Sequence, residues 1–166
     1  METVENEIAD FNFEKFQAIR SRSLGRLIWR LKRHIHLHVE PMLIAKGHAD
    51  FKLSSLAFIA NIDEHGTTNN ELAKKASVSK QAMSKVVKEL EEHGYVYTRP
   101  NEADARSSVI FLDERGKQLF VDLNQAMTDV QTRFDKAIGV KKCRQMIDTM
   151  HDLLAVLDTE EEHQKG

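Results

Sequence analysis

The sequence is poor in the residues that crosslink a chain or interrupt its helices. Among 166 residues there is one cysteine, Cys143, so the chain can form no internal disulfide and no cysteine-based zinc cluster. The only prolines are Pro41 and Pro100, and only seven residues are glycine, which favours long helices. No apolar run reaches the roughly 18 residues of a membrane span, and residues 1–11 lack the apolar core of a signal peptide. These absences predict a cytoplasmic, mainly helical protein without a membrane segment.

Neither sign of charge dominates. The 24 Lys and Arg residues stand against 26 Asp and Glu residues, and the formal net charge is −2. This balance argues against a protein that coats nucleic acid along its whole length, but it allows a small basic surface on a neutral body. The sequence also lacks a Gly-rich phosphate loop, a nucleophile elbow and an HExxH motif, so neither an enzyme nor a cofactor is predicted.

Amphipathic patterns occupy both ends of the chain. Apolar residues recur every three to five positions from about residue 12 to 38, and they predict a first helix that Pro41 ends or kinks. A second long helix is predicted at 114–138, with Asp113 as its N-cap. Gly139 breaks it before a last helix with near-heptad spacing, whose polar end after Glu160 should fray.

These terminal helices carry more apolar surface than a chain of this size can cover by itself. A helix with uncovered apolar surface usually packs against a partner, so we expect residues 12–45 and 114–158 to form a helical dimerisation region. Its predicted contact residues are Phe13, Phe16, Leu24, Leu27, Leu31, Met146, Met150, Leu153, Leu154 and Leu157.

Residues 53–112 have a different character and predict a winged helix-turn-helix. A helix after Leu53 with Ser54 as its cap should end at Gly66, and Asn69 should cap a short helix at 70–76. A tight connection at 77–79 leads to a helix capped by Ser79 that stops at Gly94. Two short helices joined by such a turn form a helix-turn-helix. The alternating segments 95–99 and 107–112, joined by a polar loop, then predict a β-hairpin.

The predicted helix that follows Ser79 has two faces. Apolar Met83, Val86, Val87 and Leu90 share one side, and polar residues project from the other. A recognition helix enters the major groove by its N-terminal part, where Gln pairs with adenine and Lys donates to guanine. The alternative is an ordinary solvated face. The DNA contacts predicted for the two helices of the helix-turn-helix and for the cap residue between them are Lys74, Lys75, Ser79, Lys80, Gln81, Ser84, Lys85 and Lys88.

The motifs of this segment resemble those of the MarR family of winged-helix regulators. The resemblance rests on ELA at 71–73, SVSKQAMSKVVKELEEHGYV at 77–96, RPNEADAR at 99–106 and LDERG at 112–116. The family's Asp-x-Arg wing tip is matched by Asp104 and Arg106. Its Leu-Thr-x-x-Gly helix start is matched with Asp113 in place of Thr, which is harmless because Asp caps a helix as well as Thr does. The flanking helices also fit, so the resemblance covers nearly the whole chain.

The resemblance implies a homodimer whose terminal helices interlock and whose two winged heads read a pseudo-palindromic site in double-stranded DNA. Members of the family usually repress, and a small ligand, metal or oxidant often releases them. On the wing, Arg106 is slim enough for the minor groove, and Asp104 can orient the guanidinium of Arg106 or Arg99. We therefore predict a sequence-specific repressor. A helical protein-interaction module without such DNA binding is the alternative.

The family also implies an effector, a small aromatic or phenolic ligand. Such ligands often lie between the dimer helices and the head, where Arg26, Trp29, Arg30 and Arg33 could border a pocket. The simpler alternative for Trp29 is a place in the core or the dimer interface.

The histidines and the cysteine suggest two further candidate sites, a metal site and a redox-sensing thiol, for which the sequence offers less support. His34 and His38 share a helix face while His36 points away, and Glu40, His48 and His65 are the other candidate ligands. Two histidines are too few for a structural zinc site, so no metal is predicted, although a metal-responsive regulator stays an alternative. Cys143 is interpreted as a packed thiol rather than a redox sensor, which needs an accessible thiolate.

Overall fold

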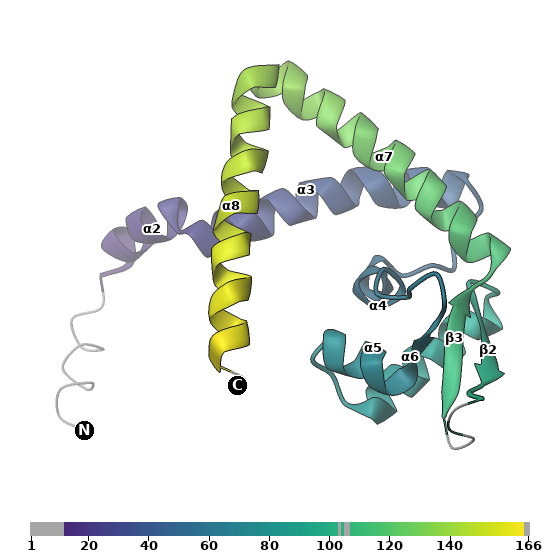
Figure 1. Cartoon of the computed structure of the whole chain (residues 1–166). Coiled ribbons are helices and arrows are strands. Elements are labelled where there is room, and N and C mark those ends of the chain that lie inside the picture. Colours follow the sequence, from purple (N-terminus) through teal and green to yellow (C-terminus); the bar gives the residue numbers. More distant parts are fainter. Residues whose placement is uncertain (1–11, 103, 105–106, 165–166) are drawn as a thin grey trace.

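The computed structural model describes residues 12–102, 104 and 107–164. Those residues form a helical frame and a small winged head (Figure 1). The N-terminal segment 1–11 and the wing-tip residue Arg106, on both of which the sequence raised expectations, lie outside the described residues. The predicted fold class, mainly α with a small β wing, is confirmed.

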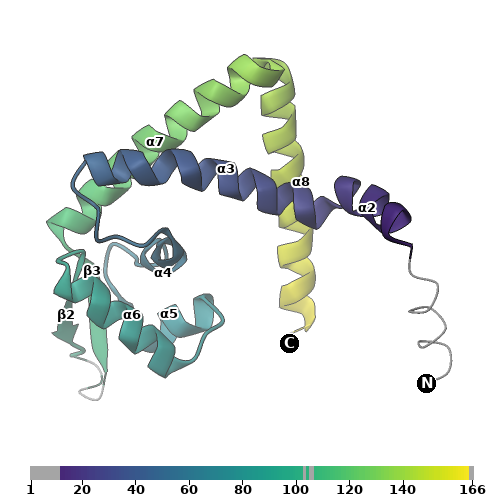
Figure 2. The ribbon, with the colours of Figure 1, turned by 180° about the vertical axis from the view of Figure 1, so that it is seen from behind.

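Four helices make the frame: α2 (Phe13–Arg22), α3 (Leu24–Ala45), α7 (Glu114–Ile138) and α8 (Val140–Gln164). Helix α3 packs against α7, and α7 packs against the first part of α8. Helices α7 and α8 meet at a sharp corner, which Gly139 forms with a φ of +88° (Figures 1 and 2). The prediction of Asp113 as N-cap and of a helix at 114–138 is confirmed, because the Asp113 side chain accepts from the backbone N–H of Glu114.

Pro41 does not end the first helix, so of the two effects expected from the sequence only a kink remains. Helix α3 runs through Pro41 to Ala45, and the break falls instead at Ser23, between α2 and α3. A proline inside a helix removes one backbone hydrogen bond. Here Val39 and Leu43, on either side of it, are buried in the core, and this packing holds the helix together. Helix α8 continues past Glu160 to Gln164.

The head contains a 3₁₀ turn η1 (Leu53–Ser55), three short helices and a sheet. The helices are α4 (Leu56–Ile59), α5 (Asn69–Lys75) and α6 (Lys80–Glu92), and the strands are β1 (Thr67–Thr68), β2 (Val96–Pro100) and β3 (Ser108–Leu112). The strands are antiparallel in the order β1-β3-β2, with Thr67 opposite Ile110 and Tyr97 opposite Phe111. The predicted hairpin is thus confirmed, and β1 adds a third strand to it.

Two local predictions in the head are wrong by small margins. The helix expected from Leu53 to Gly66 is only the turn η1 followed by α4, and Ser54 does not cap it. Thr68 rather than Asn69 caps α5, because Thr68 and Glu71 form a reciprocal capping box that satisfies two backbone N–H groups at once. Ser79 does cap α6, and Gly94 follows it with a φ of +72°, as predicted.

The core of the head is continuous with that of the frame. Ile59, Leu72, Met83, Tyr95 and Ile110 are almost fully buried and belong to one cluster with residues of α3 and α7. Gly116 lies where the first turn of α7 meets this core. A Cβ atom placed there would lie 2.1 Å from the backbone oxygen of Tyr95, so only glycine allows this close approach.

Candidate DNA-binding surface

The turn of the helix-turn-helix is held by the backbone and by one side chain. Ser77 has a φ of +52°, the left-handed conformation that closes the turn. Val78 packs against the core and donates its N–H to the carbonyl of Ala73, which is itself buried. Asn69 donates from Nδ2 to the Lys80 carbonyl and to Ser84 Oγ, at 3.2 and 3.0 Å. Helix α6 is therefore fixed against the start of α5.

Helix α6 presents a polar face to solvent. Met83, Val87 and Leu90 are buried, as the periodicity predicted, whereas the predicted reading residues of its N-terminal half are exposed. The Gln81 side chain forms no hydrogen bond with any described residue. Ser84 is less suited to read a base, because its hydroxyl already donates to the Lys80 carbonyl and accepts from Asn69.

The predicted lysine contacts differ in what surrounds them. Lys74, Lys80 and Lys85 are exposed and belong to no ion pair among the described residues. Lys75 instead reaches Asp63 at 3.0 Å, and Lys88 lies 3.8 Å from Glu92 on the same helix. Exposed pairs of this kind are worth little, so both ammonium groups could still exchange their partner for a phosphate.

The wing has an aromatic face. Tyr97 of β2 stacks on Phe111 of β3, with ring centroids 5.3 Å apart. The Arg99 guanidinium lies over both rings, 5.1 Å from the Tyr97 centroid, an arrangement that attracts the cation to the ring face. Arg99 is therefore held on the wing by aromatic rings. These aromatic partners were not expected from the sequence, which offered Arg99 only as one of two guanidinium groups, with Arg106, that Asp104 could orient.

Glu91 attaches α6 to the wing, a role that no sequence motif indicated. Its Oε1 accepts from both the backbone N–H and the hydroxyl of Thr98, at 2.9 and 2.8 Å. Its role depends on how β2 turns back along α6, and no residue motif encodes that turn.

A polar joint, made of His48, Asp50, Tyr95, Arg115 and Asp122, connects the head with the frame. His48 is buried, with Nε2 3.1 Å from Asp122 Oδ2 and Nδ1 3.2 Å from Tyr95 Oη. The Tyr95 hydroxyl donates to Asp50 at 2.8 Å, and Arg115 forms a two-pronged pair with the same carboxylate. His48 is thus a structural residue here, and not the metal ligand for which it was considered.

The carboxylates of the joint are held in their charged form. Burial alone would raise the pKa of Asp50, but hydrogen bonds from Arg115 and Tyr95 outweigh it and keep that pKa below its ordinary value. Burial likewise acts on Asp122, and hydrogen bonds from His48 and Gln118 outweigh it, so its pKa is lowered too. Burial and the bond to Asp50 raise the pKa of the Tyr95 hydroxyl, which therefore stays a donor.

Comparison with known proteins agrees with this geometry. Residues 49–107 match the sequence model of the MarR family, and they contain the helix-turn-helix, strand β2 and the loop after it. This segment therefore carries the sequence signature of the MarR family. A curated relative, the transcriptional activatory protein BadR of Rhodopseudomonas palustris, is 26% identical over 94 residues. These residues are 57% of this chain and 53% of BadR, so the chain spans about half the length of that relative.

Solved MarR-family structures have the same fold. A regulator from Methanosarcina mazei matches with a TM-score of 0.65 at 19% identity, over 80% of this chain and 94% of its own. Apo MarR from E. coli matches with a TM-score of 0.63 at 21% identity, over 80% of this chain and 97% of its own. CouR from Rhodococcus jostii, solved with p-coumaroyl-CoA, matches with a TM-score of 0.59 at 21% identity, over 81% of this chain and 93% of its own. At these identities the matches establish the fold, including the long helices that flank the MarR-family head.

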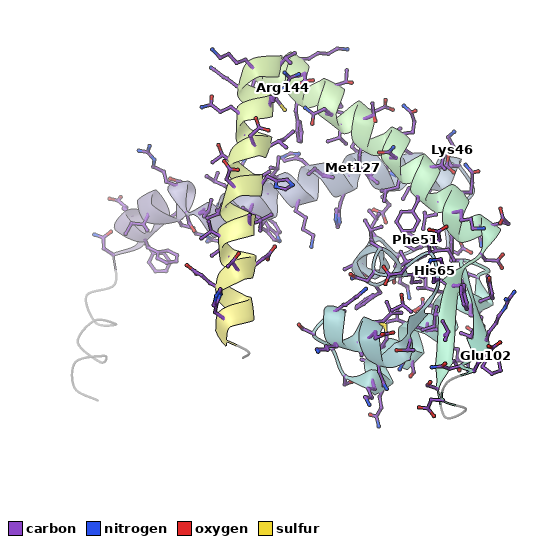
Figure 3. All side chains as sticks on the ribbon, in the orientation of Figure 1. Lys46, Phe51, His65, Glu102, Met127 and Arg144 are labelled. Carbon is purple, nitrogen blue, oxygen red and sulfur yellow. The ribbon has the colours of Figure 1, made fainter. Side chains whose placement is uncertain are left out.

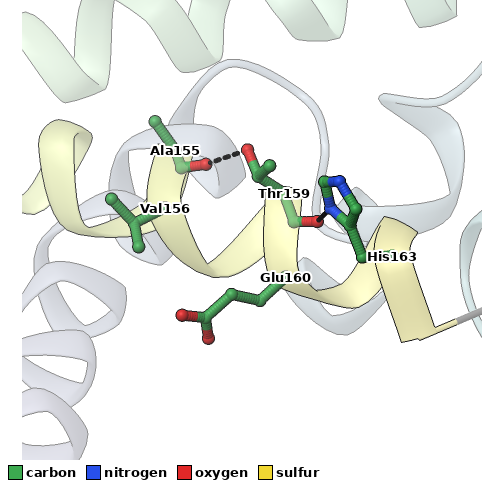
Figure 4. A pocket seen from close by; sticks show the side chains of 5 residues that line it. All are labelled: Ala155, Val156, Thr159, Glu160 and His163. Carbon is green, nitrogen blue, oxygen red and sulfur yellow. Dashed lines mark hydrogen bonds between the residues drawn. The ribbon is translucent and has the colours of Figure 1, made fainter.

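The helices that flank the head carry uncovered apolar side chains. Figure 3 shows side chains of α2, of the first part of α3 and of α8 projecting away from the chain. Leu31 and Met146 are half-buried. The other predicted dimerisation residues are exposed, namely Phe13, Phe16, Leu24, Leu27, Met150, Leu153, Leu154 and Leu157. The hollow in Figure 4 is lined by α8 residues alone, among them Val156 and Thr159, so it too belongs to this uncovered helix.

The predicted ligand residues lie together near the start of α3. Arg26, Trp29, Arg30 and Arg33 line one surface hollow of about 740 Å³, which Arg20 of α2 completes. None of the four arginines belongs to an ion pair among the described residues, and Trp29 is 63% exposed. The sequence pattern therefore identified a real cluster of cations around an aromatic ring, although not one enclosed between frame and head.

The histidine cluster does not have the form of a metal site. His34 and His38 line a hollow of about 230 Å³ between α3 and α7, and His36 lines a different one beside Trp29. Arg133 donates to His38 Nδ1 at 2.8 Å and places a guanidinium next to it. No group of three or more His, Cys, Asp or Glu side chains suited to a metal exists among the described residues.

Cys143 is a packed thiol. It is fully buried beneath the corner of α7 and α8, and Gln131 donates to its sulfur at 3.1 Å. Burial raises the pKa of the Cys143 thiol, which is the opposite of what a thiolate sensor needs.

None of the helices among the described residues has the length and apolar character that a membrane span requires.

Proposed function

We propose that this chain is a MarR-type, dimeric, sequence-specific DNA-binding regulator of transcription. The observation that carries the proposal is α6, which buries Met83, Val87 and Leu90 and turns Gln81 and Lys85 into solvent. A helix of this kind enters the major groove with its N-terminal half. The wing, with Asp104 and Arg106 at its tip, would then reach the neighbouring minor groove, and Arg106 would make the contact there.

The proposed partner of the frame is a second copy of the chain. The uncovered apolar residues of α2, α3 and α8 need a partner, and a two-fold dimer is the commonest arrangement that buries the same patch on both copies. Two heads related by a two-fold axis read two half-sites of opposite orientation, hence a pseudo-palindrome. We propose repression as the output, because a dimer bound across a promoter blocks access to it.

Selection of bound sequences from a random duplex library tests this function directly. We expect an enriched motif with two inverted half-sites about one helical turn apart. Binding to unselected duplex should be weaker and fall steeply with salt, since it depends on phosphate contacts. A protein-interaction module would enrich no motif and show no such salt dependence.

Variants of α6 identify the reading residues within the same assay. Gln81→Ala and Lys85→Ala should each lose about 1–3 kcal/mol on the selected site, because a base edge loses its bonding partner. Binding to random duplex should fall much less. Lys136→Ala, on α7 and away from the head, is the matched control. If the α6 variants weaken specific and random binding equally, these residues contact phosphates instead of bases.

We further propose that the arginine–tryptophan hollow binds an anionic aromatic effector. Four guanidinium groups that form no ion pair among the described residues can pair with carboxylate or phosphate oxygens, and an exposed tryptophan offers its face to an aromatic ring. The neighbouring fold of CouR was solved with p-coumaroyl-CoA, a phenolic ligand with phosphate groups. This supports the same class of ligand here.

Trp29 is the only tryptophan of the chain, so its fluorescence reports on the hollow. Titration with p-coumarate and with p-coumaroyl-CoA should change this fluorescence, and Arg30→Gln should weaken the binding about tenfold. Arg144→Gln, on α8 and outside the hollow, is the control. Unchanged fluorescence with both ligands, or undiminished affinity of the Arg30 variant, would remove the hollow as the effector site.

A further inference from the structure

Arg115 of the polar joint touches three parts of the chain at once. It stands in the first turn of α7 and forms its two-pronged pair with Asp50, which follows α3. The same guanidinium also donates to the Gly47 carbonyl at 2.8 Å and to the His93 carbonyl at 2.5 Å. Gly47 lies just beyond the end of α3, and His93 is the C-cap of α6.

These bonds join the recognition helix to the frame through backbone atoms. A side chain could rotate away from its partner, but the carbonyls of residues 47 and 93 move only when the ends of α3 and α6 move. Both carbonyls lie at helix C-terminal ends, where the partial negative charge favours a cation. The guanidinium also lies over the buried Tyr95 ring, 4.4 Å from its centroid, which fixes its plane.

We propose that Arg115 is a positioning residue for DNA recognition, which sets the orientation of α6 relative to the frame and thereby the half-site spacing that the dimer accepts. The inference rests on the proposed function. The frame fixes the two-fold axis, and Arg115 fixes each recognition helix to the frame. The separation of the two α6 helices, and with it the preferred spacing, then depends on this guanidinium.

Lysine cannot replace arginine in this role. An ammonium keeps the charge but lacks the planar fork that reaches Asp50 and two carbonyls together. Arg115 is about one-third exposed, and the head core and the Asp113 cap of α7 do not include it. Arg115→Lys should therefore still fold, while α6 rotates more freely on the frame.

The test compares affinities for the selected site and for duplexes in which the spacer between half-sites is lengthened or shortened by single base pairs. The wild-type chain should strongly prefer one spacing. In Arg115→Lys the ratio between the affinity for the best spacing and the affinity for an altered spacing should fall about tenfold. The base preference inside each half-site should not change. A merely structural residue would weaken all spacings alike. Arg133→Lys, which also lies on α7 and bonds to α3 through His38 but not to α6, should keep the wild-type ratio.

A second measurement needs neither DNA nor a dimer. Spin labels at Lys88→Cys on α6 and Lys136→Cys on α7, in a Cys143→Ser background, report the distance between head and frame. Arg115→Lys should broaden this distance distribution, and Asp50→Asn, which weakens the fork but keeps its carbonyl bonds, should broaden it less. A distribution as narrow as that of the wild type, or an unchanged spacing ratio, overturns the proposal. If the wild-type chain selects no DNA motif, the proposed function fails, and the labels alone then decide whether Arg115 holds α6.

Discussion

Replacing both Leu153 and Leu157 with glutamate should leave no stable dimer at micromolar concentration. These side chains are 51% and 45% exposed in the single chain, and we expect the partner to cover them. Each buried leucine contributes about 1.5–3 kcal/mol, and a glutamate in its place would have to leave water without a partner for its charge. Sedimentation velocity of the wild-type chain and the double variant measures the effect.

The head should stay folded in this double variant. Both leucines lie in the second part of α8, whereas α8 packs on α7 through its first part, around Cys143. The variant should therefore keep its helical circular dichroism while it sediments as a monomer. Lys141→Glu, in the first turn of α8, changes charge without removing apolar surface and should remain dimeric. A wild-type chain that is itself a well-behaved monomer would contradict both the dimer and the palindromic site.

Gly116→Ala should cost about 3 kcal/mol or more of unfolding free energy, at or beyond the upper end for an overpacked core site. The added Cβ would lie 2.1 Å from the Tyr95 backbone oxygen and 3.3 Å from Leu112 Cδ2. The first of these is a backbone atom, so no side-chain rotation relieves the clash. Either the start of α7 or the beginning of β2 must move. Urea denaturation at fixed protein concentration measures the loss.

Gly25→Ala is the matched helical control. Gly25 lies in α3, and a Cβ atom there meets nothing within 4 Å in the chain. Exchange of a helical glycine for alanine alone should stabilise by about 0.5–1 kcal/mol. If both variants were equally stable, the close approach of α7 to β2 could not be as tight as described.

Local chemistry explains which parts of the fold could be predicted from the sequence. Ser79, Gly94 and Asp113 act within a few residues of their own position, and each was predicted correctly. The continuation of α3 through Pro41, where an end of the helix was one of the two expectations, has the opposite cause. The local effect of proline is to break a helix, but the burial of its neighbours in the tertiary core overrides that effect.

The candidate site divides in the same way. The exposure of Gln81 and Lys85 follows from the helical period of α6, so the sequence alone could predict it. The bonds of Arg115 and of Glu91 join elements whose relative orientation no short pattern encodes. The aromatic contacts of Arg99 could not be predicted from the sequence, because its partners on β2 and β3 face each other only after the strands have paired.

Because Cys143 is buried, the rate at which a thiol reagent modifies it reports local opening of the structure around it. It is the only thiol, and it is covered where α8 turns back on α7. A reagent in solution can reach the sulfur only during the moments when that corner comes apart. The speed of its modification is therefore governed by how often the corner opens and how quickly it closes again, and only secondarily by the reactivity of the sulfur itself.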